Sequence, residues 1–112
     1  MERIINVGGK DVPFKATAAT TRRYRQMTGR DLFADISALA QASENPAGFS
    51  AVNLQAFEDI AYIMAKQADP DIPGTPDEWM DQFDIFSIYE IMPQIVELWG
   101  LSTTPIEKSK KK

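Results

Sequence analysis

The pair Gly8-Gly9 stands between two six-residue segments, Glu2–Val7 and Lys10–Lys15. Two consecutive glycines adopt the two positive φ angles of a type I′ turn without steric cost, and such a turn joins antiparallel strands closely. This glycine pair therefore constrains the backbone path of the segments on both sides of it. The sequence therefore predicts that the protein begins with a β-hairpin.

Pairing about this turn places Ile5 opposite Val12 and Ile4 opposite Pro13. One face of the hairpin then carries the apolar side chains Ile5, Val7, Val12 and Phe14. Pro13 lies opposite Ile4 at a non-hydrogen-bonded site, so its missing N–H does not disrupt the pairing of the two strands. Proline there instead prevents a further strand from pairing along the outer edge. We predict that the second strand is an edge strand.

Helical periodicity and capping residues indicate helices from residue 18 to residue 99. The predicted helices cover Ala18–Thr28, Asp31–Ala42, a segment from Ser50 or Asn53 to about Ala68, Pro76–Phe83 and Ile85–Trp99. Thr17 can cap the first helix and Gly29 can end it. Thr75 and Asp84 are predicted to cap the last two. Loops are expected at residues 44–50 and 69–74.

Together these elements predict an α+β fold, in which an N-terminal β-hairpin is followed by a bundle of about four to five α-helices. A chain of 112 residues with 44% hydrophobic residues is long enough for one modest core. We expect residues 1–101 to form a single compact domain, with the hairpin in residues 1–16 and the helices in residues 17–101. Residues 102–112 are predicted to be a flexible, lysine-rich tail.

The predicted helix Ile85–Trp99 is apolar almost all round, and Pro93 within it predicts a kink. A helix of this kind either lies in the centre of the core or is partly covered by another protein. Core packing is one interpretation of its aromatic residues; an exposed patch for self-association or for a client protein is the other. The residues assigned to the second hypothesis are Phe86, Tyr89, Met92, Val96 and Trp99.

Charge is sorted along the chain. Residues 1–30 carry a net charge of +5, residues 31–106 carry thirteen acids against Lys66 alone, and residues 107–112 add +3. Such a distribution favours contacts between copies or with oppositely charged partners. We therefore expect a homo-oligomer, with an electrostatic interface in which the basic first block contacts the acidic block of a neighbouring copy. The residues assigned to this interface are Arg22, Arg23 and Arg25.

The same arginines surround Tyr24, which by itself favours nucleic-acid binding through phosphate contacts and base stacking. The acidic block of residues 31–106 argues against it, because it would repel a polyanion. The remaining interpretation is a solvated helix face, with Tyr24 and Met27 turned into the core.

Composition excludes several chemistries. The chain has no Cys and no His, which removes disulfides, thiolate ligands and the commonest general base. The acids in residues 69–84 match no calcium-binding loop, and Asp77 and Glu78 among them are explained by helix capping and the helix dipole. We therefore predict no enzyme activity, no metal site and no cofactor. No apolar run is long enough to span a bilayer, and no secretion signal is evident, so we expect no membrane association and a reducing cytoplasm.

The stretch Ile4–Ile36, IINVGGKDVPFKATAATTRRYRQMTGRDLFADI, resembles the small tail assembly chaperones of long-tailed bacteriophages and prophages. The resemblance lies in a hairpin followed by a helix that ends in Thr28-Gly29 and continues into Arg30-Asp31-Leu32-Phe33. The later helices agree with the family in number and order. The family has no catalytic motif, so the resemblance implies no catalytic residue.

The resemblance implies a protein of the host cytoplasm that is absent from the finished virion. Chaperones of this kind bind the long helical tape-measure protein and help to recruit tail-tube subunits around it. Many are also made in a longer form by ribosomal frameshifting, and Lys110-Lys111-Lys112 fits the A-rich codons on which ribosomes slip. The alternatives are a structural head–tail connector or minor tail protein, and a small nucleic-acid-binding regulator.

Overall fold

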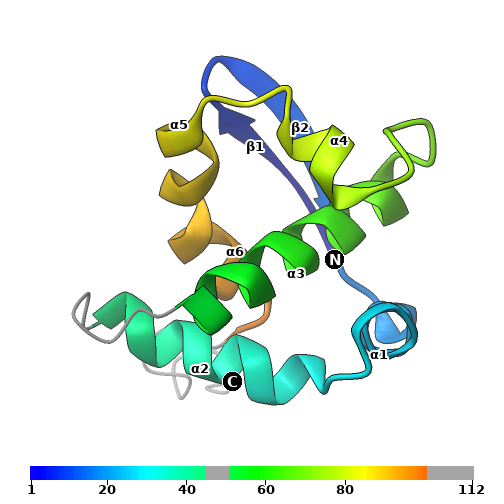
Figure 1. The fold of residues 1–112 in the computed structure, drawn as a ribbon, viewed down its shortest axis with the longest axis vertical. Coiled ribbons are helices and arrows are strands. Elements are labelled where there is room, and N and C mark those ends of the chain that lie inside the picture. Colours follow the sequence, from blue (N-terminus) through cyan, green and yellow to red (C-terminus); the bar gives the residue numbers. More distant parts are fainter. Residues whose placement is uncertain (45–50, 101–112) are drawn as a thin grey trace, which may run out of the picture.

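The computed structural model describes residues 1–44 and 51–100 (Figure 1). The predicted loop at residues 44–50, apart from residue 44, and the predicted tail at residues 102–112 lie outside the described residues. The chain begins with strands β1 (Glu2–Val7) and β2 (Lys10–Lys15), which pair antiparallel. The hairpin prediction is therefore confirmed.

The register of the hairpin is also as predicted, with Ile5 opposite Val12 and Ile4 opposite Pro13. The side chains predicted for its apolar face are all buried: Ile5, Val7, Val12 and Phe14. Gly8 and Gly9 adopt φ angles of 61° and 92°, which only glycine reaches readily at both positions.

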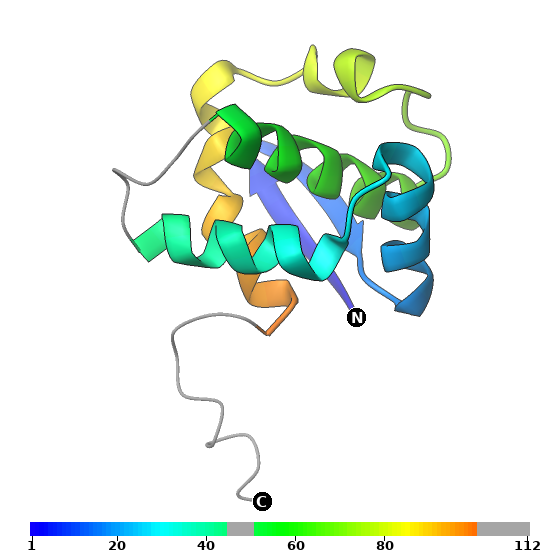
Figure 2. The same cartoon turned by 60° about the horizontal axis from the view of Figure 1, so that its bottom comes forward.

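Helices form the rest of the described structure. They are α1 (Ala18–Thr28), α2 (Leu32–Glu44), α3 (Ala51–Ala68), α4 (Pro76–Met80), α5 (Ile85–Glu90) and α6 (Met92–Leu98). The longest of them, α3, lies at the centre and packs against β2, α1, α2 and α4, as Figures 1 and 2 show. The α+β class and the order of hairpin and helices are confirmed.

The core follows one stripe of α3, whose side chains Phe57, Ile60, Ala61 and Met64 are fully buried. Trp79 of α4 closes the core beside β2, with its indole edge-on to Phe14 at 6.3 Å between ring centroids. Of the two α1 residues expected inside, Tyr24 is buried but Met27 is 43% exposed. Met27 follows Thr20 by seven residues and so lies on nearly the same face of α1, but it stands in the last turn of the helix, where its side chain stays exposed.

The predicted helix Ile85–Trp99 is in fact two helices, interrupted at Ile91. Pro93 has no N–H to donate to the carbonyl of Tyr89, so the first helix ends and the carbonyl oxygen of Ile91 starts the next one. It accepts from the backbone N–H groups of Gln94 and Ile95 at 2.9 and 3.0 Å.

Helix α4 is shorter than predicted and ends at Met80 rather than Phe83. The residues after Met80 form turns with hydrogen bonds between residues three positions apart. In one of them the N–H of Phe83 donates to the carbonyl oxygen of Met80 at 3.1 Å. Such bonds tighten the end of a helix and stop its regular hydrogen-bond pattern.

The turn of the hairpin packs against α5. A Cβ atom added at Gly8 would lie 2.7 Å from Ser87 Oγ, whereas one added at Gly9 would meet nothing within 4 Å. Glycine at position 8 therefore serves both the turn and the close approach of a helix far along the chain.

Candidate partner-binding pocket

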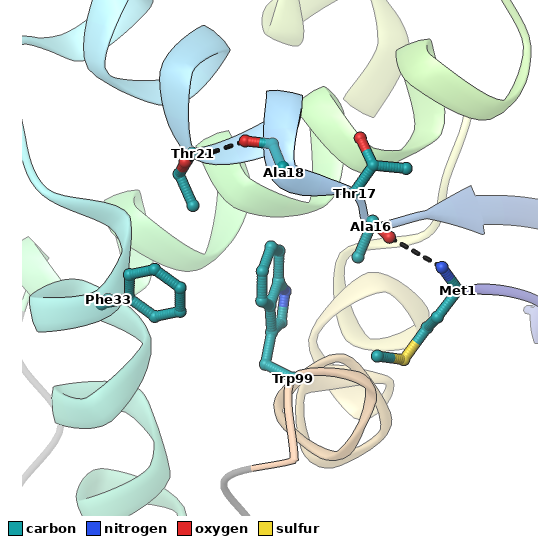
Figure 3. Close-up of a pocket in the computed structure, with 7 residues that line it drawn as sticks. All are labelled: Met1, Ala16, Thr17, Ala18, Thr21, Phe33 and Trp99. Carbon is teal, nitrogen blue, oxygen red and sulfur yellow. Dashed lines mark hydrogen bonds between the residues drawn. The ribbon is translucent and has the colours of Figure 1, made fainter.

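An apolar pocket of about 380 Å³ opens where the first turns of α1 and α2 meet the end of α6 (Figure 3). Its lining residues are Met1, Ala16, Thr17, Ala18, Thr21, Phe33 and Trp99. Two of them, Met1 and Phe33, are among the most exposed large apolar residues of the described structure, at 65% and 54%. Exposed apolar surface gathered in a concave site is typical of a surface that binds a partner.

Two aromatic rings form one wall of the pocket. Phe33 and Trp99 meet edge to face, with ring centroids 6.0 Å apart and an interplanar angle of 85°. The indole N–H of Trp99 donates to Met64 Sδ at 3.3 Å, which anchors the ring to α3. The backbone N–H of Phe33 donates to Asp31 Oδ1 at 3.2 Å, so Asp31 supports the first turn of α2 that carries the ring.

The polar groups of the opposite wall are engaged within the protein. Met1 and Ala16 exchange two backbone hydrogen bonds of 2.8 Å. The hydroxyl of Thr21 donates to the carbonyl oxygen of Ala18 at 3.0 Å, and Thr17 Oγ1 accepts from Gln67 Nε2 at 2.5 Å. What this wall presents to a ligand is therefore mainly methyl and methylene surface, which suits an apolar side chain.

Arginines extend from the pocket along α1. Arg22 and Arg25 follow Ala18 and Thr21 by one helical turn each, so they continue the face of α1 that lines the pocket. Arg23 lies on the other side of the helix. All three are exposed, α1 contains no acid, and none of them pairs with a carboxylate among the described side chains, those of residues 1–42 and 53–100. The structure thus groups two of the three predicted arginines with the pocket.

The five residues predicted for client binding or self-association do not share a surface. Met92 and Val96 are each only 4% exposed, because α6 turns them into the core; the expectation that they contact a partner is corrected on this point. Tyr89 is half-buried and its hydroxyl donates to Glu58. Phe86 is 72% exposed on α5, away from the pocket, and Trp99 lines the pocket.

Phe33 is an aromatic residue of the pocket that the sequence analysis did not include among the candidate site residues. Leu32, Ile36 and Leu39 of α2 are buried at helical spacing, and Phe33 directly follows the first of them. In the structure Phe33 lies at the edge of that stripe and points out. An aromatic residue at the edge of an otherwise complete apolar stripe is the signal that could have identified it.

The clearest cluster of ionisable side chains ties α1 to α2. Asp35 Oδ2 accepts from the hydroxyl of Tyr24 at 2.5 Å and from Arg30 Nε at 3.0 Å. Burial, and then the hydrogen bond to Asp35, raise the pKa of Tyr24 well above its usual value. Burial, followed by the charge of Glu58, also raises the pKa of nearby Asp59. Each of these shifts has a structural cause, so the cluster indicates a stabilising network between two helices.

Within the described residues, no three acidic side chains are grouped so that they could hold a metal ion. None of the helices in that part of the chain combines the length and apolar character needed to cross a membrane. Comparison with protein-family models, curated proteins and solved structures finds no match to this chain.

Proposed function

We propose that this protein is a tail assembly chaperone of a long-tailed bacteriophage. It acts in the host cytoplasm, binds the tape-measure protein, helps to recruit tail-tube subunits, and does not remain in the virion. The sequence resemblance over Ile4–Ile36 supports the family, and the apolar pocket carrying Phe33 and Trp99 is the observation that supports a client-binding role.

The chemistry of the pocket suits a helical client. An amphipathic helix presents apolar side chains one turn apart, and one such side chain can enter the pocket against Phe33 and Trp99. Aromatic residues in a pocket supply most of the binding energy in interfaces of this kind. The neighbouring Arg22 and Arg25 would favour acidic residues beside the apolar anchor, which adds selectivity.

The test is co-expression with the tape-measure protein of the same phage genome, followed by measurement of the soluble complex. We expect Phe33→Ser to weaken binding about tenfold or more, as truncation of an aromatic anchor does. Ile4→Ser is the matched control, since Ile4 is 66% exposed but lies on the hairpin, outside the pocket. Wild-type binding by Phe33→Ser would remove the pocket from the client site, and no binding by wild type would overturn the proposal.

A second measurement separates this function from the structural alternatives. Mass spectrometry of purified phage particles should find no copies of this chain. Stoichiometric presence in particles would contradict the chaperone role and favour a head–tail connector or a minor tail protein.

A further inference from the structure

The most exposed aromatic side chain of the described structure, Phe86, has no role in the pocket. Together with Ile85, which is 65% exposed, it forms the first turn of α5, and Phe86 itself is 72% exposed. The cause is local. Asp84 Oδ2 accepts from the backbone N–H of Phe86 at 3.1 Å and starts the helix, while the buried residue Ile88 fixes which side of α5 faces the core. Ile85 and Phe86 are left on the outside.

Acidic side chains flank this apolar pair. Asp84 directly precedes it, Glu90 follows Phe86 by one helical turn, and both are exposed. No Lys or Arg occurs between residues 67 and 107, so nothing in this stretch offsets the negative charge. We call the surface formed by Asp84, Ile85, Phe86 and Glu90 the acidic knob.

The pocket described above has the complementary character. It is apolar inside, and the exposed Arg22 and Arg25 continue from its wall without acidic partners among the described residues. Figure 1 places α5 toward the end of the long axis that carries the hairpin turn, whereas α1 and α2 lie toward the other end. The two surfaces therefore cannot meet within one copy.

We propose that the acidic knob of one copy docks in the pocket of a second copy, so that copies associate head to tail. Phe86 enters the pocket against Phe33 and Trp99, while Asp84 and Glu90 approach the arginines of α1. Because the knob and the pocket lie toward opposite ends of the molecule, this head-to-tail contact is heterologous, and it builds a ring or a filament.

Charge favours this arrangement over a symmetric dimer that pairs like surfaces. A two-fold contact between knobs would bring carboxylates together, and a two-fold contact between pockets would bring unpaired arginines together; both are repulsive. Only the contact of knob with pocket joins opposite charges around an apolar centre. The proposal does not depend on which client the protein binds, although both partners would use the same pocket.

The test uses two variants that each keep one of the two surfaces. Phe86→Ser removes the apolar part of the knob and keeps the pocket; Phe33→Asp keeps the knob and places a like charge in the pocket that the knob should enter. Both positions are exposed, so both variants should fold, and circular dichroism checks this. Ile4→Ser, exposed on the hairpin, is the control that should associate like wild type.

In sedimentation velocity, wild type should form species larger than a dimer that grow with concentration. Each variant alone should stay monomeric, and an equimolar mixture should give a 1:1 heterodimer that grows no further. Raising salt from about 50 mM to about 500 mM should weaken all of these contacts, because charge around the apolar centre is screened.

Three results would overturn the proposal. They are monomeric wild type throughout the concentration range, undiminished association of Phe86→Ser, and failure of the two folded variants to form a heterodimer when mixed. The outcome is separate from that of the client test, since Phe86→Ser keeps the pocket and should still bind the tape-measure protein if the proposed function is correct.

Discussion

Tyr89 shows how a single side chain joins two helices that are far apart in the sequence. Its hydroxyl donates to a carboxylate oxygen of Glu58 on α3, and its ring lies 5.8 Å from that of Phe57. The hydrogen bond to Glu58, together with burial, raises the pKa of Tyr89 to about 12. Both the polar and the apolar parts of this side chain are thus engaged within the protein.

This pKa gives a prediction about alkaline pH. The folded protein keeps the Tyr89 proton up to about pH 12, whereas the unfolded chain loses it near 10.0. The stabilisation is therefore complete below pH 10 and disappears as pH rises toward 12. Tyr89→Phe should lower the free energy of unfolding by about 1 to 2 kcal/mol near neutral pH. It should also flatten the decline above pH 10, as measured by urea unfolding at several pH values; an unchanged decline would contradict this account.

Glu58→Gln provides the matched control. It keeps an acceptor for the Tyr89 hydroxyl but removes the charge that disfavours the phenolate, so the pKa of Tyr89 should move back toward 10.0. The loss of stability should then begin at lower pH than in wild type.

Among the elements, α1 is held at its start both by its N-cap residue Thr17 and by Gln67 of α3. Thr17 Oγ1 accepts from the backbone N–H of Ala19 at 3.2 Å and from Gln67 Nε2 at 2.5 Å. Gln67 Oε1 accepts in turn from the hydroxyl of the buried Thr20 at 2.6 Å. One amide of α3 thus fixes where α1 begins, and with it one wall of the pocket.

We expect Thr17→Ala to lower the free energy of unfolding by about 1 to 2 kcal/mol, the upper part of the range for helix caps. Thr75→Ala is the comparison, because Thr75 caps the exposed start of α4 with one hydrogen bond to Glu78 and has no second helix to hold. That change should cost about 0.5 to 1 kcal/mol. Equal losses in chemical denaturation would show that the bond to Gln67 contributes nothing.

Elements whose signals are local were predictable from the sequence. The glycine pair set the hairpin and its register, and Thr17 and Gly29 set both ends of α1. The prediction of one kinked helix over Ile85–Trp99 was wrong. The continuous apolar pattern indicated a single helix, whereas Pro93 ends the first helix and begins a second. Which residues of α6 are buried depends on how this helix packs against the others, and the spacing of apolar residues along the sequence does not report that packing.

The candidate site was harder to predict for the same reason. Its aromatic pair joins Phe33 and Trp99, sixty-six positions apart in the sequence, and only the packing of α2 against α6 brings them together. Sequence reasoning identified Trp99 and the arginines of α1, but it had no means of placing them beside one pocket.

At the scale of the whole molecule, the two proposals predict a competition. If the tape-measure segment and the acidic knob of a neighbouring copy use the same pocket, they exclude each other. Adding an excess of the client segment to associated wild-type protein should therefore give 1:1 complexes of chain and client. Sedimentation velocity measures this directly, and large assemblies that contain client at every pocket would contradict a shared site.

The approach of Gly8 to Ser87 has a consequence for how this chain can vary. Judged by the turn alone, Asn-Gly is as good a sequence as Gly-Gly, and exchanging one for the other would be harmless. Here the added Cβ would lie 2.7 Å from Ser87 Oγ and 3.0 Å from Ser87 Cβ, and rotation of the hydroxyl relieves only the first contact, so α5 disfavours a residue that the turn accepts. The residues at positions 8 and 87 are therefore coupled. Related chains that have a residue larger than glycine at position 8 should carry a residue smaller than serine at position 87.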